Sequence, residues 1–202
     1  MDYRDKYIKY KTKYIKLMKQ LGGVIEASFD NSYVEMIDTQ DKLDEIKDEL
    51  LERYKICEPM DALNIDEIKF MNDGSIYWVL KDLEYDQIIG SIQTSDLEPY
   101  ENSSKFELIG GITGAKGLFI TGVCNSMPDK FKNVATILLK AIDEYAWDRY
   151  DYLLLHADIS RDYLHSEGER KGLYIKNGFL KIGILRAGIL HDTDSWIMRK
   201  DL

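Results

Sequence analysis

The chain has 202 residues and a mass of 23.5 kDa, which is enough for one well-buried domain and short for two. Hydrophobic residues make up 45% and charged residues 31% of the sequence, and with only three prolines this mixture excludes a collagen-like or Pro-rich disordered chain. The longest apolar runs have the length of a strand, so we expect no transmembrane helix, and the Lys/Tyr-rich start lacks the apolar segment of a secretory signal.

Charge is divided unevenly along the chain. The formal net charge is −9, but seven basic and two acidic residues give residues 1–20 a charge of +5 and leave −14 for the remainder. We therefore expect a basic segment attached to an acidic domain. An acidic domain disfavours broad contact with nucleic acid and attracts small cationic molecules or basic peptides.

Cysteine and histidine are sparse. The two cysteines, Cys57 and Cys124, do not form a disulfide framework, so we expect two free thiols in a reducing, intracellular compartment. The three histidines and two cysteines are scattered without the spacing of metal ligands, and no metal site is predicted.

Residues 1–22 are predicted to form an amphipathic helical arm that ends at Gly22-Gly23. One face carries an apolar stripe of Tyr3, Tyr7, Tyr10, Tyr14, Leu17 and Leu21, beside a stripe of lysines. Such an arm packs on its own domain, pairs with a second copy in a homodimer, or binds an anionic surface, nucleic acid or a membrane, and the sequence leaves these alternatives open. The segment resembles the Lys/Tyr-rich openings of many giant-virus proteins of the mimivirus type, which implies a viral protein of the host cytoplasm or the virion.

The next elements are predicted in chain order within a body of residues 24–202. A short strand at 33–37 is followed by a helix at 41–55, where Leu43, Ile46, Leu50 and Tyr54 recur at helical spacing. One helical turn is expected near 60–63. Strands at 75–81 and 88–94 are joined by a polar stretch and predict a hairpin, whereas the polar, Gly-bearing stretch 95–116 predicts a loop.

The second half alternates strands and helices. A strand at 117–124 precedes the strongest predicted helix, 131–148, and the wholly apolar strand 152–157 is typical of a sheet centre. Ser166 and Glu169 form a capping box for a helix that reaches Asn177. Strands at 179–186 and 195–199 complete the chain.

This order predicts a mixed sheet with one parallel crossover. The helix 131–148 lies between two apolar strands, which makes a right-handed parallel unit. No Gly-x-Gly-x-x-Gly turn follows a strand, so a dinucleotide-binding fold is excluded. The Gly-rich stretch 110–117 is not a phosphate loop, because no helix begins after Lys116.

Residues 117–179 resemble the GNAT family of acyl-CoA-dependent N-acyltransferases. The resemblance rests on Gly117–Val123, the loop Lys130–Ala135, the strand Leu153–Ala157 and the ending Leu173-Tyr174-Ile175-Lys176-Asn177-Gly178-Phe179, with a supporting final strand at 196–202. It implies an α/β (α+β) fold in which helices flank a mixed, mostly antiparallel sheet. The implied reaction moves an acetyl group directly from acetyl-CoA to the primary amine of a small molecule or peptide, without a metal. The alternative is a virion or scaffold protein that kept the fold, lost efficient catalysis and uses its arm for assembly or binding.

The resemblance also implies how acetyl-CoA binds. The family pattern [RQ]-x-x-G-x-[GA] falls on Lys130, Asn133 and Ala135, where the first turn of a helix aims N–H groups at the diphosphate. Asn tolerates the left-handed backbone that the family's Gly adopts. The implied cofactor-binding residues are Val123, Cys124 and Asn125, through backbone bonds to the pantetheine arm, and Lys130, Phe131, Lys132, Asn133, Val134 and Ala135.

Two residues are the implied catalytic groups. Tyr174 corresponds to the family tyrosine that protonates the leaving thiolate, although a half-buried helix tyrosine is the structural alternative. His156 is a candidate base, with Asp158 as another and a purely structural histidine as the alternative. A covalent Cys124 assisted by His156 is disfavoured, because the loop favours direct transfer. Glu35, Asp82 and Glu84 are candidates for a cation-attracting pocket, and the inserted stretch 161–165 for acceptor specificity.

Overall fold

The computed structural model describes residues 24–26, 32–57, 75–83, 86–97, 104–159, 172–188 and 192–202. The arm at 1–22, the turn near 60–63, the stretch 161–165, the capping box of Ser166 and Glu169, and Glu84 lie outside these residues and stay predictions. No helix in the described ranges is both long enough and apolar enough to cross a membrane.

The described strands form one mixed sheet, as predicted. Its order is β1-β2-β3-β4-β5-β6-β8-β7, and every neighbouring pair is antiparallel except β5 and β6. The strands are β1 Val24–Glu26, β2 Ser32–Ile37, β3 Ile76–Asp82, β4 Ile88–Leu97, β5 Gly117–Asn125, β6 Tyr152–Asp158, β7 Leu180–Leu185 and β8 Ser195–Asp201. The hairpin between β3 and β4 and the parallel crossover from β5 to β6 are both confirmed.

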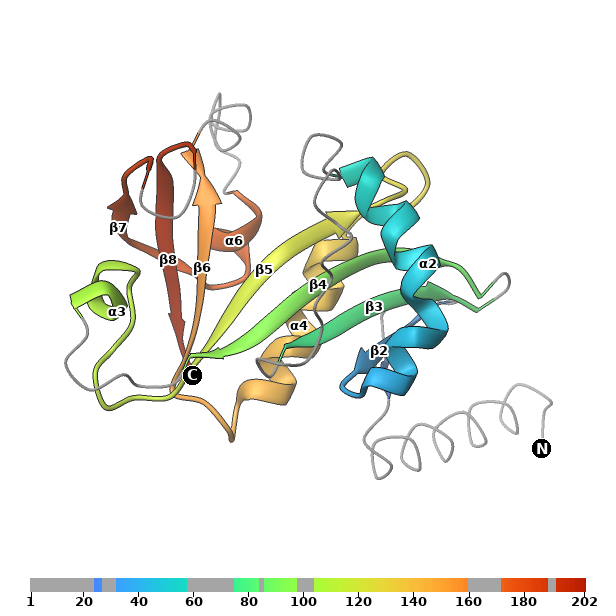
Figure 1. Ribbon diagram of the computed structural model, residues 1–202, viewed down its shortest axis with the longest axis horizontal. Helices are drawn as coiled ribbons and strands as arrows, with labels where there is room; N and C mark the ends of the chain where they lie inside the picture. The colour runs from blue at the N-terminus through green and yellow to red at the C-terminus, as the bar shows by residue number, and fades with distance from the viewer. Residues whose placement is uncertain are drawn as a thin grey trace, which may run out of the picture.

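Helices cover both faces of this sheet, because successive residues of each strand point to opposite sides (Figure 1). The helix α2, Gln40–Cys57, buries Leu43, Ile46 and Leu50 in a cluster with β2, β3 and β4. The helix α4, Val134–Ala146, packs on the opposite face against Trp78, Ile92 and the apolar centre of β6. We refer to these as the α2 face and the α4 face.

The α2 face continues under the segment that precedes β5. Here α3, Ser104–Leu108, is followed by a segment whose Ile109 and Ile112 pack on β6, β7 and β8 in an apolar cluster with Tyr152, Leu154 and Ile197. The loop predicted at 95–116 is therefore partly wrong: β4 runs to Leu97, and α3 forms where the buried Phe106 anchors one helical turn. A polar, Gly-bearing composition hides a helix this short.

The parallel strands β5 and β6 separate part-way along their length. They pair only from Gly117 with Tyr152 to Ile120 with Leu155, and beyond this point the two strands continue without pairing with each other (Figure 1). Beyond the split, β5 carries one extra residue against β4, since Ser91 pairs with Cys124 but Gln93 pairs with Thr121. This β-bulge centres on Gly122, whose φ of 56° is left-handed.

The helix α4 begins at Val134, three residues later than the apolar pattern predicts. Asn133 breaks the helix because its backbone is left-handed, with φ 64° and ψ 13°. Phe131 continues the apolar pattern but packs against the core from the preceding loop. A side chain can therefore satisfy the helical period without belonging to the helix.

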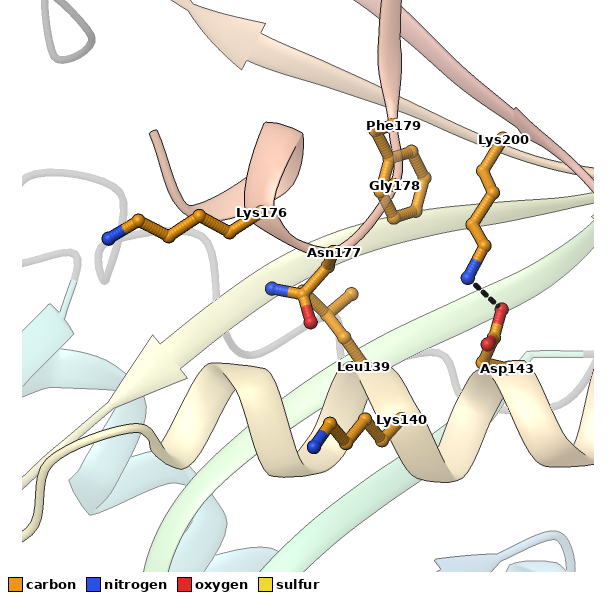
Figure 2. A pocket seen from close by; sticks show the side chains of 8 residues that line it. All are labelled: Leu139, Lys140, Asp143, Lys176, Asn177, Gly178, Phe179 and Lys200. Atoms are coloured by element: carbon orange, nitrogen blue, oxygen red, sulfur yellow. Dashed lines mark hydrogen bonds and ion pairs between the residues drawn. The ribbon is translucent and has the colours of Figure 1, made fainter. Parts of the chain in front are cut away.

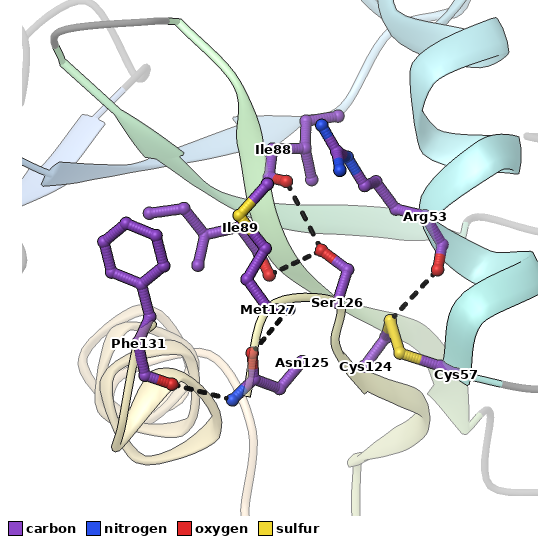
Figure 3. Close-up of a disulfide and its surroundings, with 9 residues drawn as sticks. All are labelled: Arg53, Cys57, Ile88, Ile89, Cys124, Asn125, Ser126, Met127 and Phe131. Carbon is purple, nitrogen blue, oxygen red and sulfur yellow. Dashed lines mark hydrogen bonds between the residues drawn. A yellow bond between two sulfur atoms is a disulfide. The ribbon is translucent and has the colours of Figure 1, made fainter. Parts of the chain in front are cut away.

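The prediction of two free thiols is wrong. Cys57, the last residue of α2, forms a disulfide with Cys124 in β5, across a Cα–Cα distance of 5.7 Å (Figure 3). The two residues are 67 positions apart, and only the packing of α2 on β5 brings them together. The disulfide fixes the end of α2 against the part of β5 that lies beyond the split.

Candidate active site

A short loop connects β5 to α4 and is held by Asn125 and Ser126 (Figure 3). The Asn125 side chain accepts a hydrogen bond from the backbone N–H of Met127 at 3.1 Å and donates one to the carbonyl of Phe131 at 3.0 Å. The buried Ser126 donates from both its backbone N–H and its hydroxyl to the carbonyl of Ile89. These bonds fix the point from which α4 starts.

The N-terminus of α4 is suited to bind an anion. The left-handed Asn133 directly precedes the helix and forms no side-chain cap, and the first turn holds no acidic residue. The N–H groups of a first turn have no helical acceptor, and the helix dipole adds positive potential there. The buried Val134 lies directly against Gly90 of β4, where a Cβ atom would collide with it.

The loop adds positive charge beside this helix end. Lys130 and Lys132 are exposed, and neither forms an ion pair with another described residue. Ala135, in the first turn, is small and half-buried. The sequence-predicted residues 130–135 therefore lie together around one helix end.

The predicted pantetheine residues occupy β5 beyond the split. Val123 packs against the α4-face core, whereas Cys124 points to α2 and holds the disulfide. One edge of this stretch pairs with β4, and no described strand pairs with its other edge. The disulfide also argues against the disfavoured cysteine nucleophile at position 124, because the sulfur is bonded to Cys57.

Tyr174 lies on the α4 face. It belongs to α6, Leu173–Lys176, and packs against the core with its ring 6.1 Å from that of Phe179. The carbonyl of Tyr174 accepts hydrogen bonds from the backbone N–H groups of Asn177 and Phe179. The left-handed Gly178, φ 90°, closes this turn as the sequence predicts.

His156 lies on the opposite, α2 face, just past the last β5–β6 pair. Its Nε2 is 2.9 Å from the carbonyl oxygen of Ile109, and its ring stands edge-on to Phe119 at 5.0 Å. Since a carbonyl only accepts, Nε2 carries the hydrogen in this contact, so Nδ1 is the ring nitrogen left to exchange a proton. The structure thus places Tyr174 and His156 on opposite faces of the sheet.

Of the carboxylates considered for a cation pocket, Glu35 and Asp82 lie on β2 and β3, and Glu84 lies outside the described residues. Glu35 lies on β2 and pairs with Lys81 of β3 at 3.1 Å, three strands away from the split. Across the described ranges, no three His, Cys, Asp or Glu side chains converge as metal ligands would.

A pocket of about 340 Å³ opens on the α4 face between α4 and the turn from α6 to β7 (Figure 2). Lys200 donates to Asp143 at 2.6 Å at one end of it. Lys140 and Lys176 line it, and neither forms an ion pair with a described residue. The remaining lining residues are Leu139, Asn177, Gly178 and Phe179. Lys140 lies about 10 Å along the helix axis from Asn133, so positive charge extends from the helix end into this pocket.

Two residues at the split were missed by sequence reasoning. Gly122 was seen only as part of a strand, and Tyr54 only as part of an apolar helix stripe. In the structure the Tyr54 hydroxyl lies against Gly122, where a Cβ atom would collide with it. The available signal was an isolated glycine inside an apolar strand, which often marks a bulge or a close approach.

The sequence matches no protein-family model, and no curated protein is detectably similar to it. Solved structures do resemble the fold. Arabidopsis thaliana NAA60 in complex with acetyl-CoA superposes with a TM-score of 0.58 at 14% identity, covering 85% of this chain and 98% of that one. An aminoglycoside 6'-acetyltransferase type Ii superposes with a TM-score of 0.55 at 16% identity, covering 82% of this chain and 96% of that one. A spermidine N-acetyltransferase SpeG chimera from Vibrio cholerae and hSSAT gives 0.55 at 14% identity, with 83% and 95% covered. The chain has the fold of these N-acetyltransferases.

Proposed function

We propose that this protein is an acetyl-CoA-dependent N-acetyltransferase that moves the acetyl group directly to a primary amine. The observation that carries the proposal is the uncapped N-terminus of α4, opened by a left-handed Asn133 next to the point where β5 and β6 separate. Two solved structures of the same fold hold acetyl-CoA or coenzyme A, which supports the same co-substrate here.

The residues around this helix end fit the diphosphate of CoA. The backbone N–H groups of Lys132 to Ala135 supply donors, and Lys130 and Lys132 supply charge. Phe131 packs its side chain against the core, which supports a helix end left open to the diphosphate. The unpaired edge of β5 at Val123 to Asn125 offers backbone groups to the amides of the pantetheine arm, as an added strand would use them.

The two candidate catalytic groups would act from opposite faces. The amine nitrogen bonds to the acetyl carbonyl carbon, the carbon–sulfur bond breaks, and the electron pair leaves with sulfur. His156 takes the proton lost by the amine through Nδ1, directly or through water, and Tyr174 gives one to the departing thiolate. The acceptor would therefore approach from the α2 face. The negative net charge of residues 21–202 favours a cationic amine as the acceptor.

Release of free thiol from acetyl-CoA tests the proposal. A panel of polyamines, amino sugars and peptide amines is incubated with the full chain, and acetylated product is identified by mass spectrometry. We expect thiol release that depends on one class of amine. A folded protein that neither binds CoA nor acetylates any amine would contradict the proposal and favour the noncatalytic alternative.

A further inference from the structure

Tyr54 lies at the place where the acetyl group would sit, although the predicted chemistry does not use it. It belongs to the last turn of α2, and its hydroxyl oxygen occupies the space that a Cβ atom on Gly122 would need. Gly122 is the centre of the β5 bulge and follows the last residue pair of β5 and β6 by two positions. A phenol therefore reaches the split from the α2 face.

The direction of the bound co-substrate leads to the same place. If the diphosphate lies at α4, beyond Asn125, the pantetheine arm runs back along Val123 to the split, so the thioester reaches Gly122. This step rests on the proposed function. The bulge also takes backbone groups of β5 out of the ladder with β4, which leaves them available to the same ligand.

The position of Tyr54 is fixed on both sides. Leu50, one turn earlier, is fully buried, and Cys57, almost one turn later, is bonded to Cys124. The Sγ of Cys124 also lies 3.7 Å from the carbonyl oxygen of Arg53 (Figure 3). Two features require glycine at position 122: its φ is left-handed, and a side chain there would displace the Tyr54 phenol. A fixed donor contributes more to catalysis than a mobile one, since it does not reorganise during the reaction.

We propose that the Tyr54 hydroxyl donates a hydrogen bond to the carbonyl oxygen of the acetyl thioester. Negative charge develops on this oxygen when the amine attacks, and a donor aimed at it stabilises the transition state. The bond would make Tyr54 a catalytic residue distinct from Tyr174, whose proposed partner is sulfur.

Infrared spectroscopy of acetyl-CoA labelled with ¹³C at the carbonyl tests this without knowledge of the acceptor. The band of the bound carbonyl in the full-length protein is compared for wild type, Tyr54→Phe and the control Tyr33→Phe. Tyr33 donates to Asp86 on the surface, far from the split. We expect Tyr54→Phe to move the band to higher frequency, while Tyr33→Phe leaves it unchanged. With an acceptor in hand, kcat should fall roughly 10²-fold with KM for acetyl-CoA unchanged.

The outcomes separate this inference from the proposed function. An unchanged band in a Tyr54→Phe protein that still binds acetyl-CoA overturns the role of Tyr54 and leaves the proposed function intact. A wild type that binds no acetyl-CoA overturns both. Should Tyr54→Phe fail to fold, 3-fluorotyrosine at position 54 keeps the ring and strengthens the donor; the band should then move to lower frequency, and no movement overturns the inference.

Discussion

Asn133 shows how one backbone conformation defines the candidate site. Its left-handed φ of 64° turns the chain into α4 with the first N–H groups exposed to a ligand. The resemblance to the family's loop pattern puts Asn133 in the place of a glycine with left-handed backbone. The backbone angle confirms that Asn133 adopts this left-handed conformation. The prediction succeeded because Asn is one of the few residues that adopt left-handed backbone readily.

Substitutions at position 133 should therefore show whether the backbone conformation or the Asn side chain matters for stability and CoA affinity. Asn133→Gly should keep both stability and CoA affinity, since glycine enters this region without strain. Asn133→Ala should lower the free energy of unfolding by about 1 kcal/mol, because a Cβ atom makes left-handed backbone costly. Urea unfolding and CoA titration measure the two effects, and equal behaviour of Gly and Ala would show that the conformation is unimportant.

Each of the two catalytic candidates should lower turnover when its reactive group is removed. Tyr174→Phe should lower kcat roughly 10²-fold with KM for acetyl-CoA unchanged, because only proton delivery to sulfur is lost. His156→Gln can keep a side-chain N–H donor near the carbonyl of Ile109 while losing the basic nitrogen, and should lower kcat by a similar factor. Steady-state kinetics on the amine found in the panel measures both. A variant that keeps wild-type kcat would remove that residue from the mechanism.

At the scale of elements, the strands and the long helices could be predicted from local sequence patterns. The contacts between elements that are distant in the sequence could not. The largely apolar β6, and the aromatic and β-branched residues of β3 and β4, are local patterns, so the bounds of these strands differ from prediction by a few residues at most. The bulge at Gly122, its contact with Tyr54, and the disulfide each join two elements. Two cysteines 67 residues apart carry no local sign of pairing, and their small number suggested free thiols.

The disulfide should stabilise the junction of α2 with β5. Closing a loop of this length corresponds to about 4 kcal/mol in the chain-entropy model. Reductant should therefore lower the thermal unfolding midpoint of wild type markedly. The double variant Cys57→Ser/Cys124→Ser should have that lower midpoint without reductant and should not respond to it. A wild type whose midpoint is insensitive to complete reduction, verified by thiol titration, contradicts this role.

At the scale of the whole molecule, the stability of the α4 face should depend on pH through Tyr150. Its hydroxyl donates to Asp96 at 2.5 Å, and burial, with this carboxylate, raises the pKa of the phenol above its usual value near 10. The folded protein thus favours the neutral phenol. Its contribution is complete below pH 10 and is lost as the pH rises above that, because the unfolded chain ionises first.

Tyr150→Phe isolates this contribution. At neutral pH the variant should be less stable than wild type by about 1–2 kcal/mol, since Asp96 loses its donor. The difference in unfolding free energy should shrink as the pH rises from 10 to 12. Urea unfolding at a series of pH values measures it. A difference that stays constant over this range would show that the phenol ionises equally in both states.

The central claim is that the N-terminus of α4 binds the diphosphate of CoA, and charge at Ala135 tests it most directly. Ala135→Asp places a carboxylate in the first turn, where the helix dipole favours it, so the free protein should be as stable as wild type or more so. The same carboxylate should repel the diphosphate and lower CoA affinity at least tenfold, whereas Ala135→Ser should bind normally. CoA at 100 times its dissociation constant should stabilise wild type and Ala135→Ser by about 2.7 kcal/mol in thermal unfolding. Equal stabilisation of Ala135→Asp, or none of wild type, would contradict the account.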